Sequence, residues 1–258
     1  MLRSIRAEWY KAVRRPYFSI LFFTCSLLTM GAVYCLYLVK NQSPGITPIG
    51  LSFALSLSPL GMIMGLWLVA VGDLIFSEQY KYHTLKNEVS FGIPRTRIYL
   101  SRWAAVFLVM LLLYAVLVAV YTLSALLLLG LERGPSDLTP ANGFLLLGYL
   151  SLAALPIWAG GLSLVIAIYF LIASANTAAI CYIVLILTLP ALLGALGQHI
   201  SPFFQLLHHL TLSYQLDLLM NLQILDWALM GRCWLVGLGW TAVSTALGLF
   251  CFSRRDLP

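Results

Sequence analysis

Charge is what this sequence has least of. Only 9% of its 258 residues are Asp, Glu, Lys or Arg, whereas 61% are hydrophobic. Soluble domains carry about 25% charged residues, so this chain has too little polar surface to cover a water-soluble globule. We attribute its net charge of +6 to membrane topology and to contact with anionic lipid rather than to nucleic-acid binding. The composition predicts an integral membrane protein with no nucleic-acid partner.

Catalytic and metal-binding motifs are also lacking. No GxxxxGK[ST] loop occurs, which excludes ATP binding in the P-loop manner, and no GxSxG supports a serine hydrolase. The five cysteines lie in apolar segments without CxxC spacing, so we interpret them as packing residues. His199, His208 and His209 have no carboxylate at metal-ligand spacing, and we expect them to pack at the membrane interface. The sequence therefore predicts no enzyme, no metal site and no bound cofactor.

Long apolar runs are what the chain does have. A helix needs about 20 apolar residues to cross a hydrocarbon core of roughly 30 Å. The first run is too long for the apolar part of a cleaved signal, so we expect a retained span. Pro156 with Gly160-Gly161 predicts a kink or break in the fourth run, and Pro190 lies near the outer end of the fifth. We expect an all-α, single transmembrane domain over 1–258, with spans at 17–39, 51–76, 103–130, 144–172, 176–196 and 233–252.

The orientation follows from Lys and Arg in the connections. Alternate segments sum to twelve basic residues on one side and three on the other. The positive-inside rule places the side with twelve in the cytoplasm. Both termini and the loop 78–102, which holds five basic residues, are therefore expected there. A polar loop of this length in an apolar chain is a place where the protein meets a cytoplasmic partner.

Three further elements are predicted outside the spans. Residues 1–16 have apolar and basic faces and predict an interfacial helix along the inner leaflet. Residues 78–91 have helical character that ends at Gly92-Ile93-Pro94. The external segment 197–231 is too polar to span and too apolar to stand in water, which favours short helices that re-enter the membrane or lie on its outer leaflet.

Two sequence features leave alternatives open. Asp73 is the one acid inside a predicted span, near its cytoplasmic end, where it either pairs with Lys81 or Arg102 or acts as a gate or coupling acid. Small residues recur at four-residue spacing, as at Gly61 and Gly65, and allow close helix packing. That packing is either within the chain or at a dimer seam.

The cytoplasmic loop carries the most specific pattern. It reads Glu78, then His83-Thr84-Leu85-Lys86-Asn87, then Gly92-Ile93-Pro94-Arg95, and a basic residue, Arg102, opens the third span. With the basic amphipathic start, the six spans, the external segment and the ending Phe252-Ser-Arg-Arg-Asp256, it resembles the membrane subunit of type-2 ATP-binding-cassette exporters. The resemblance covers the whole chain. His83 departs from it, because many relatives have Gly there.

The resemblance implies a partner and a mechanism. Two such subunits, identical or different, pair with two copies of a separate cytoplasmic ATPase, which binds the ATP and magnesium. The loop would hold a coupling helix seated on the ATPase, and ATP-driven closure would switch the spans between two packings. The residues expected to contact the ATPase are Glu78, Thr84, Leu85, Lys86 and Arg95.

The predicted substrate path is apolar. Trp67, Tyr169, Phe170 and Tyr182 would line it, which fits an amphipathic or hydrophobic cargo such as a peptide antibiotic, a drug or a lipid-like molecule. Permeases with this loop resemble those of bacterial peptide-antibiotic export and immunity, which implies a role in antibiotic resistance and a place in the cytoplasmic membrane. The alternatives are a transporter or channel that needs no ATPase, and a membrane anchor that recruits a cytoplasmic partner.

Overall fold

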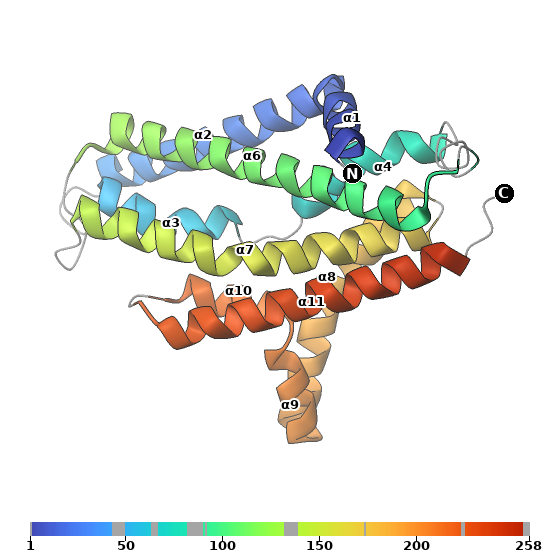
Figure 1. Ribbon diagram of the computed structural model, residues 1–258. Coiled ribbons are helices and arrows are strands. Elements are labelled where there is room, and N and C mark those ends of the chain that lie inside the picture. Colours follow the sequence, from blue (N-terminus) through green and yellow to red (C-terminus); the bar gives the residue numbers. More distant parts are fainter. Residues whose placement is uncertain are drawn as a thin grey trace.

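The structure is a computed structural model that describes residues 2–42, 50–62, 67–81, 90, 92–131, 139–172, 174–222 and 225–254. Within these ranges every regular element is a helix and no strand occurs. Most of the long helices lie side by side, whereas α1 crosses them (Figure 1). The helices are α1 (Leu2–Val13), α2 (Pro16–Gln42), α3 (Leu51–Met62), α4 (Trp67–Lys81), α6 (Arg95–Leu129), α7 (Pro140–Leu171), α8 (Ala175–His199), α9 (Pro202–His209), α10 (Leu212–Met220) and α11 (Trp227–Arg254).

Five of the described helices are long and apolar enough to cross a membrane: α2, α6, α7, α8 and α11. Large apolar side chains point outward from α2, α8 and α11, including Phe23, Leu187 and Leu235. Exposed apolar surface on this scale needs lipid or another apolar partner to cover it. The all-helical fold and the apolar helices of a multi-pass membrane protein thus agree with the sequence.

The second predicted span, 51–76, is not one helix within the described residues. It contains α3, which ends at Met62, and the first part of α4, which begins at Trp67. Each is shorter than the roughly 20 residues that a span requires. Pro59 and Gly61 lie in the last turn of α3, and both residues weaken a helix at that point. The sixth span therefore stays a prediction.

The remaining helices are longer than the apolar runs that predicted them. α6 begins at Arg95 rather than near residue 103, directly after Pro94. Its 35 residues extend for about 52 Å, which exceeds the hydrocarbon thickness by roughly 20 Å. Hydropathy marks the part of a helix that lies in lipid and not the residue at which the helix begins. α6 is therefore longer than a crossing of the hydrocarbon core requires, and its first turns form the last part of the predicted loop 78–102.

α7 is the centre of the bundle. Its buried side chains include Trp158, Leu162 and Ile166, and α11 is its most extensive neighbour. The two backbones meet where α7 carries Pro156 and α11 carries Gly237, and a Cβ added to that glycine would lie 2.3 Å from the carbonyl carbon of Pro156. Only a residue without a side chain fits at this crossing.

α7 is continuous through Pro156, so of the kink or break expected there the break does not occur, and the kink stays a prediction. Proline has no N–H, so the carbonyl of Leu152 loses its helical partner. The indole Nε1 of Trp234 on α11 donates a hydrogen bond to that oxygen at 3.2 Å. A donor from a second helix thus satisfies the carbonyl that the proline leaves unpaired.

The other interior proline, Pro190, shows the same arrangement in α8. It leaves the carbonyl of Ile186 without a helical donor, and the hydroxyl of Ser213 on α10 donates to this oxygen at 3.0 Å. At both prolines the missing backbone hydrogen bond is therefore replaced by a hydrogen bond from another helix.

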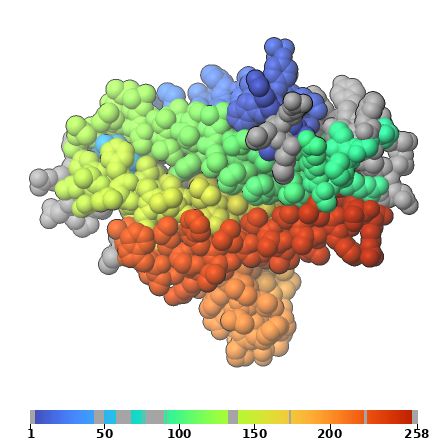
Figure 2. Space-filling view, viewed as in Figure 1, coloured from blue at the N-terminus to red at the C-terminus, as the bar shows by residue number. Residues whose placement is uncertain are grey.

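Short helices occupy the predicted external segment. α9 folds back along the end of α8, where a Cβ on Gly197 would lie 2.8 Å from the backbone nitrogen of Gln205. Ser201 caps the start of α9 and Thr211 caps the start of α10. The end of α8 and α9 project from the body of the molecule (Figures 1 and 2). Their position in the membrane or on its outer leaflet stays a prediction.

Candidate functional site

The structure brings Arg95 of the predicted coupling loop to the end of α11. Its Nη1 donates to the carbonyl oxygens of Phe252 at 2.7 Å and Ser253 at 2.9 Å, and its guanidinium lies 5.6 Å from the centre of the Phe252 ring. A positive side chain at the negative end of a helix also interacts favourably with the helix dipole. Arg95 thus ties the start of α6 to the last turn of α11.

The other predicted coupling residues lie largely outside the described part of the chain. Thr84, Leu85 and Lys86 belong to 82–89, which the structure does not describe. Glu78 lies on α4, but its side chain is outside the description. Their contact with an ATPase stays a prediction.

Asp73 lies on α4 among groups from two other helical segments. Tyr169 of α7 donates to its Oδ1 at 3.5 Å, and Arg15, between α1 and α2, is close enough to attract its charge. The Arg15 guanidinium also donates to the carbonyl of Leu74, the next residue of α4. The sequence named Lys81 and Arg102 as partners and missed Tyr169 and Arg15. Asp73 therefore lies where α4 and α7 meet the junction between α1 and α2.

An aromatic cluster joins four helices at this end of the bundle. Phe170 lies 5.2 Å from Phe76, 4.8 Å from Tyr99 and 4.6 Å from Phe252, measured between ring centres. Tyr169 stacks on Phe76 at 5.1 Å. These rings come from α4, α6, α7 and α11 and are all buried. The cluster joins the four helices at the end of the bundle where α6 and the last turn of α11 meet.

Arg102 lies beside the same cluster. It is buried, with its guanidinium 5.9 Å from the centre of the Phe170 ring. A buried cation beside an aromatic face is stabilised by the charge distribution of the ring. The sequence placed Arg102 at the membrane boundary, but it did not reveal that the side chain is enclosed.

The residues predicted to line a substrate path are packed in the interior. Tyr169, Phe170 and Tyr182 are each at most 2% exposed, and the Trp67 side chain is outside the described part. Tyr182 lies against Gly161, whose added Cβ would be 3.2 Å from the tyrosine oxygen. A buried ring lines a path only after the helices around it have moved. Their role in transport stays a prediction.

Two of the three histidines of the segment 197–231, His208 and His209, form a ring cluster with Tyr214. Tyr214 lies 4.7 Å from His208 and 4.6 Å from His209, between ring centres. No group of three or more possible metal ligands occurs among the described residues. Burial raises the pKa of the nearby Asp217 above its usual range, and electrostatic attraction to His208 opposes this rise. Gln215 donates to the carbonyl of His209 at 2.6 Å, which joins α10 to the end of α9.

Comparison with known proteins adds no further assignment. No protein-family model matches the chain, and no curated protein is significantly similar to it.

Proposed function

We propose that this chain is the membrane-spanning subunit of an ATP-binding-cassette exporter in a bacterial cytoplasmic membrane. Both termini and the loop 78–102 face the cytoplasm, as the distribution of basic residues indicates. Two permease subunits, either two copies of this chain or one copy and a different partner, assemble with two copies of a separate ATPase. The ATPase supplies the P-loop that this sequence lacks.

The loop pattern carries this proposal. Thr84-Leu85-Lys86-Asn87 followed by Gly92-Ile93-Pro94-Arg95 resembles the coupling loop of type-2 exporters. The packing offers a physical route for coupling, because α6 begins at the end of this loop and continues as one helix to Leu129. A displacement at Arg95 would reach the far end of α6 along its axis and α11 through two hydrogen bonds.

The cargo is proposed to be amphipathic or hydrophobic, such as a peptide antibiotic, a drug or a lipid-like molecule. The described spans contain few charges and many exposed apolar side chains. A highly charged polysaccharide would find few partners on such helices. Export of a peptide antibiotic would give the cell resistance to it.

The decisive experiment is co-purification of the tagged chain after expression with its neighbouring genes. The proposal expects a nucleotide-binding ATPase to co-purify and the reconstituted complex to move substrate only with ATP. Lys86→Glu should leave ATP hydrolysis but uncouple it from transport. Arg232→Glu, at an exposed arginine on α11 far from the loop in sequence, serves as the matched charge-reversal control.

Two outcomes would overturn the proposal. One is transport by the purified chain alone, without any nucleotide-hydrolysing partner. The other is an external loop, which can be measured by introducing Thr84→Cys after the five native cysteines have been replaced by serine. Labelling of that position by an impermeant thiol reagent added outside intact cells would place the loop on the wrong side.

A further inference from the structure

α1 is held on the bundle by the face that was expected to enter the membrane. Ala12 is 1% exposed, Trp9 packs against the main hydrophobic core, and most of the neighbours of α1 belong to α6. The predicted apolar face is therefore largely used in contacts with protein. Lipid binding through that face would require α1 to leave its place on α6.

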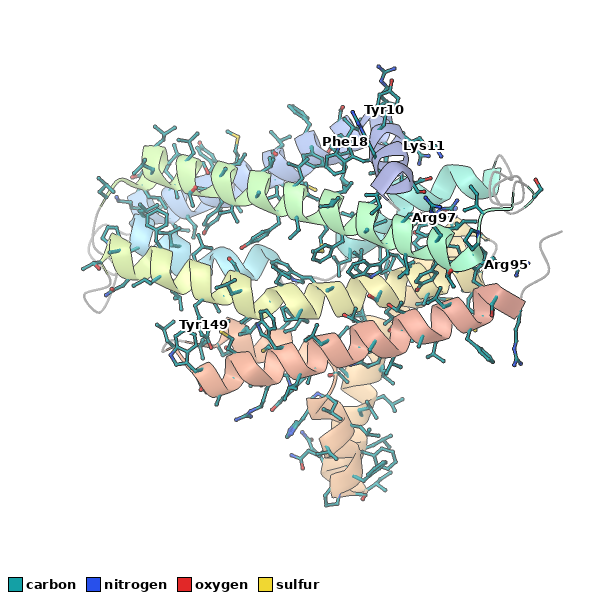
Figure 3. All side chains as sticks on the ribbon, in the orientation of Figure 1. Tyr10, Lys11, Phe18, Arg95, Arg97 and Tyr149 are labelled. Atoms are coloured by element: carbon teal, nitrogen blue, oxygen red, sulfur yellow. The ribbon has the colours of Figure 1, made fainter. Side chains whose placement is uncertain are left out.

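The outward face of α1 carries a basic and aromatic row. Arg6 and Tyr10 lie four residues apart on one side of α1. Arg14 follows the last residue of α1, and its backbone N–H donates to the carbonyl of Tyr10 at 3.4 Å, so it continues the same row. All three are exposed, and Tyr10 projects away from the bundle (Figure 3). The guanidinium of Arg14 lies 4.5 Å from the centre of the Tyr10 ring. This ring holds the guanidinium over the outer surface of the helix.

α1 packs mainly against α6 and to a smaller extent against α2 and α4. Of these neighbours only α4 carries acids, Glu78 and Asp73, and the Asp73 carboxylate accepts from Tyr169 and lies near Arg15. Glu8 is the only acidic residue of α1, and it forms the only ion pair among the described residues, with Lys11 at 3.1 Å. α2 and α6 contain neither Asp nor Glu. Arg6 and Arg14 thus present two guanidinium groups without a carboxylate from α2 or α6.

The position along the chain brings this row to the height of the lipid headgroups. α2, a candidate span, begins at Pro16, only two residues after Arg14. A helix joined so closely to the end of a span lies at the boundary between hydrocarbon and water. Tyrosine is enriched at that boundary, and the planar guanidinium of arginine binds phosphate oxygens in pairs.

From this arrangement we infer that the Arg6–Tyr10–Arg14 face of α1 binds the phosphate of an anionic phospholipid in the inner leaflet. The two guanidinium groups contact the phosphate oxygens, and the tyrosine ring lies beside the glycerol region. Lipid recognition is thus assigned to the polar face of α1, whereas its apolar face binds protein. The inference does not depend on the proposed transport function.

The test compares lipids that differ in headgroup charge. The full chain in a neutral detergent is titrated with phosphatidylglycerol or phosphatidylcholine of the same acyl chains, and bound lipid is counted by native mass spectrometry. We expect the natural chain to prefer phosphatidylglycerol. The double variant Arg6→Gln/Arg14→Gln should bind phosphatidylglycerol about thirtyfold more weakly. Its binding of phosphatidylcholine should fall much less, because the choline cation offsets the charge of the phosphate. Arg232→Gln removes an exposed arginine from α11 and should change neither.

Two further measurements keep the inference falsifiable. Arg6→Lys/Arg14→Lys keeps the charges and should restore most of the preference, while the natural chain should lose it as salt is raised to about 1 M. Equal phosphatidylglycerol binding by the natural chain and the Gln double variant would overturn the inference. So would a double variant that keeps the lipid preference but no longer co-purifies a cytoplasmic protein, because the face would then bind protein.

Discussion

α7 and α8 are two apolar helices with one proline inside each, and their surroundings differ greatly. α7 is buried among six other described helices, whereas only Ala178 and Tyr182 of α8 are buried. Each proline leaves one carbonyl without its helical donor. In both helices a side chain from a later helix supplies the missing hydrogen bond, Trp234 to Leu152 and Ser213 to Ile186.

The difference lies in what else holds each site. At Pro156 the backbones of α7 and α11 touch through Gly237, and Gly160 adds a second close approach. At Pro190 the hydroxyl of Ser213 provides a single hydrogen bond to a helix that is mostly exposed. The carbonyl that Pro156 leaves unpaired thus lies at a close backbone contact between two helices. The carbonyl that Pro190 leaves unpaired is held by one side-chain hydrogen bond. Four changes would break or sharpen this contrast.

The largest effect is expected at the crossing of α7 and α11. Gly237→Ala places a Cβ against backbone atoms of Pro156 that cannot rotate away, so it should cost about 3 kcal/mol of unfolding free energy. The measurement is reversible unfolding in mixed detergent micelles. Gly239→Ala on the same helix is the matched control, because nothing lies within 4 Å of its added Cβ. Equal stability of the two variants would contradict the close crossing.

The hydrogen bond from α11 should give the next largest effect. Trp234→Phe removes the indole donor and leaves the Leu152 carbonyl unsatisfied, at a cost of about 1 kcal/mol beyond the loss of ring contacts. Pro156→Ala restores a backbone N–H in reach of that carbonyl. In the Pro156→Ala background the cost of Trp234→Phe should therefore shrink by about the same amount. If Trp234→Phe lowers the unfolding free energy equally in both backgrounds, the hydrogen bond from Trp234 does not compensate for Pro156.

The tether at α8 should be weaker. Ser213→Ala removes the hydroxyl that donates to Ile186 and should cost about 0.6 kcal/mol. Ser213→Thr keeps a hydroxyl and serves as the control. In the Pro190→Ala background the effect of Ser213→Ala should disappear. If Ser213→Ala lowered the unfolding free energy as much as Gly237→Ala does, α8 would be held as firmly as α7.

The smallest effect concerns pH on the α8–α10 side. Burial raises the pKa of Asp217 in the folded protein, so its contribution to stability is present at low pH and is lost as pH rises through the folded-state pKa. The unfolding free energy of Asp217→Asn should therefore rise relative to that of the natural chain between about pH 4 and pH 7. The residue is largely exposed, which limits the gain to about 0.5 kcal/mol or less. Thermal unfolding at the two pH values measures it, and a gain at pH 4 alone would reverse the assigned sign.

The sequence predicted the helices better than their ends. The spans expected at 17–39 and 176–196 differ from α2 and α8 by at most three residues at either end. α6 begins eight residues before its predicted span, since helix formation continues where hydropathy falls. Pro156 correctly marked an unusual position in α7, but an expected break was not observed. The donor that preserves the helix lies 78 residues later, and no local pattern announces it.

The candidate site was predicted only in outline. The loop pattern singled out Arg95, but its partners on α11 follow 157 residues later and depend on the folded arrangement. Asp73 was recognised because an acid in an apolar segment is costly, whereas its neighbours Arg15 and Tyr169 come from other helices. A sequence shows which polar groups need a partner. It does not show which distant element provides one.

The last turn of α11 completes the aromatic cluster late in the synthesis of the chain. Phe252 is wholly buried against Phe170, and both belong to a cluster whose other rings are made earlier. During synthesis the face of Phe170 that Phe252 covers stays uncovered until the last turn of α11 has been made. A chain that stops before this turn would leave the Phe170 ring without that cover, and Arg95 without its two acceptors on α11.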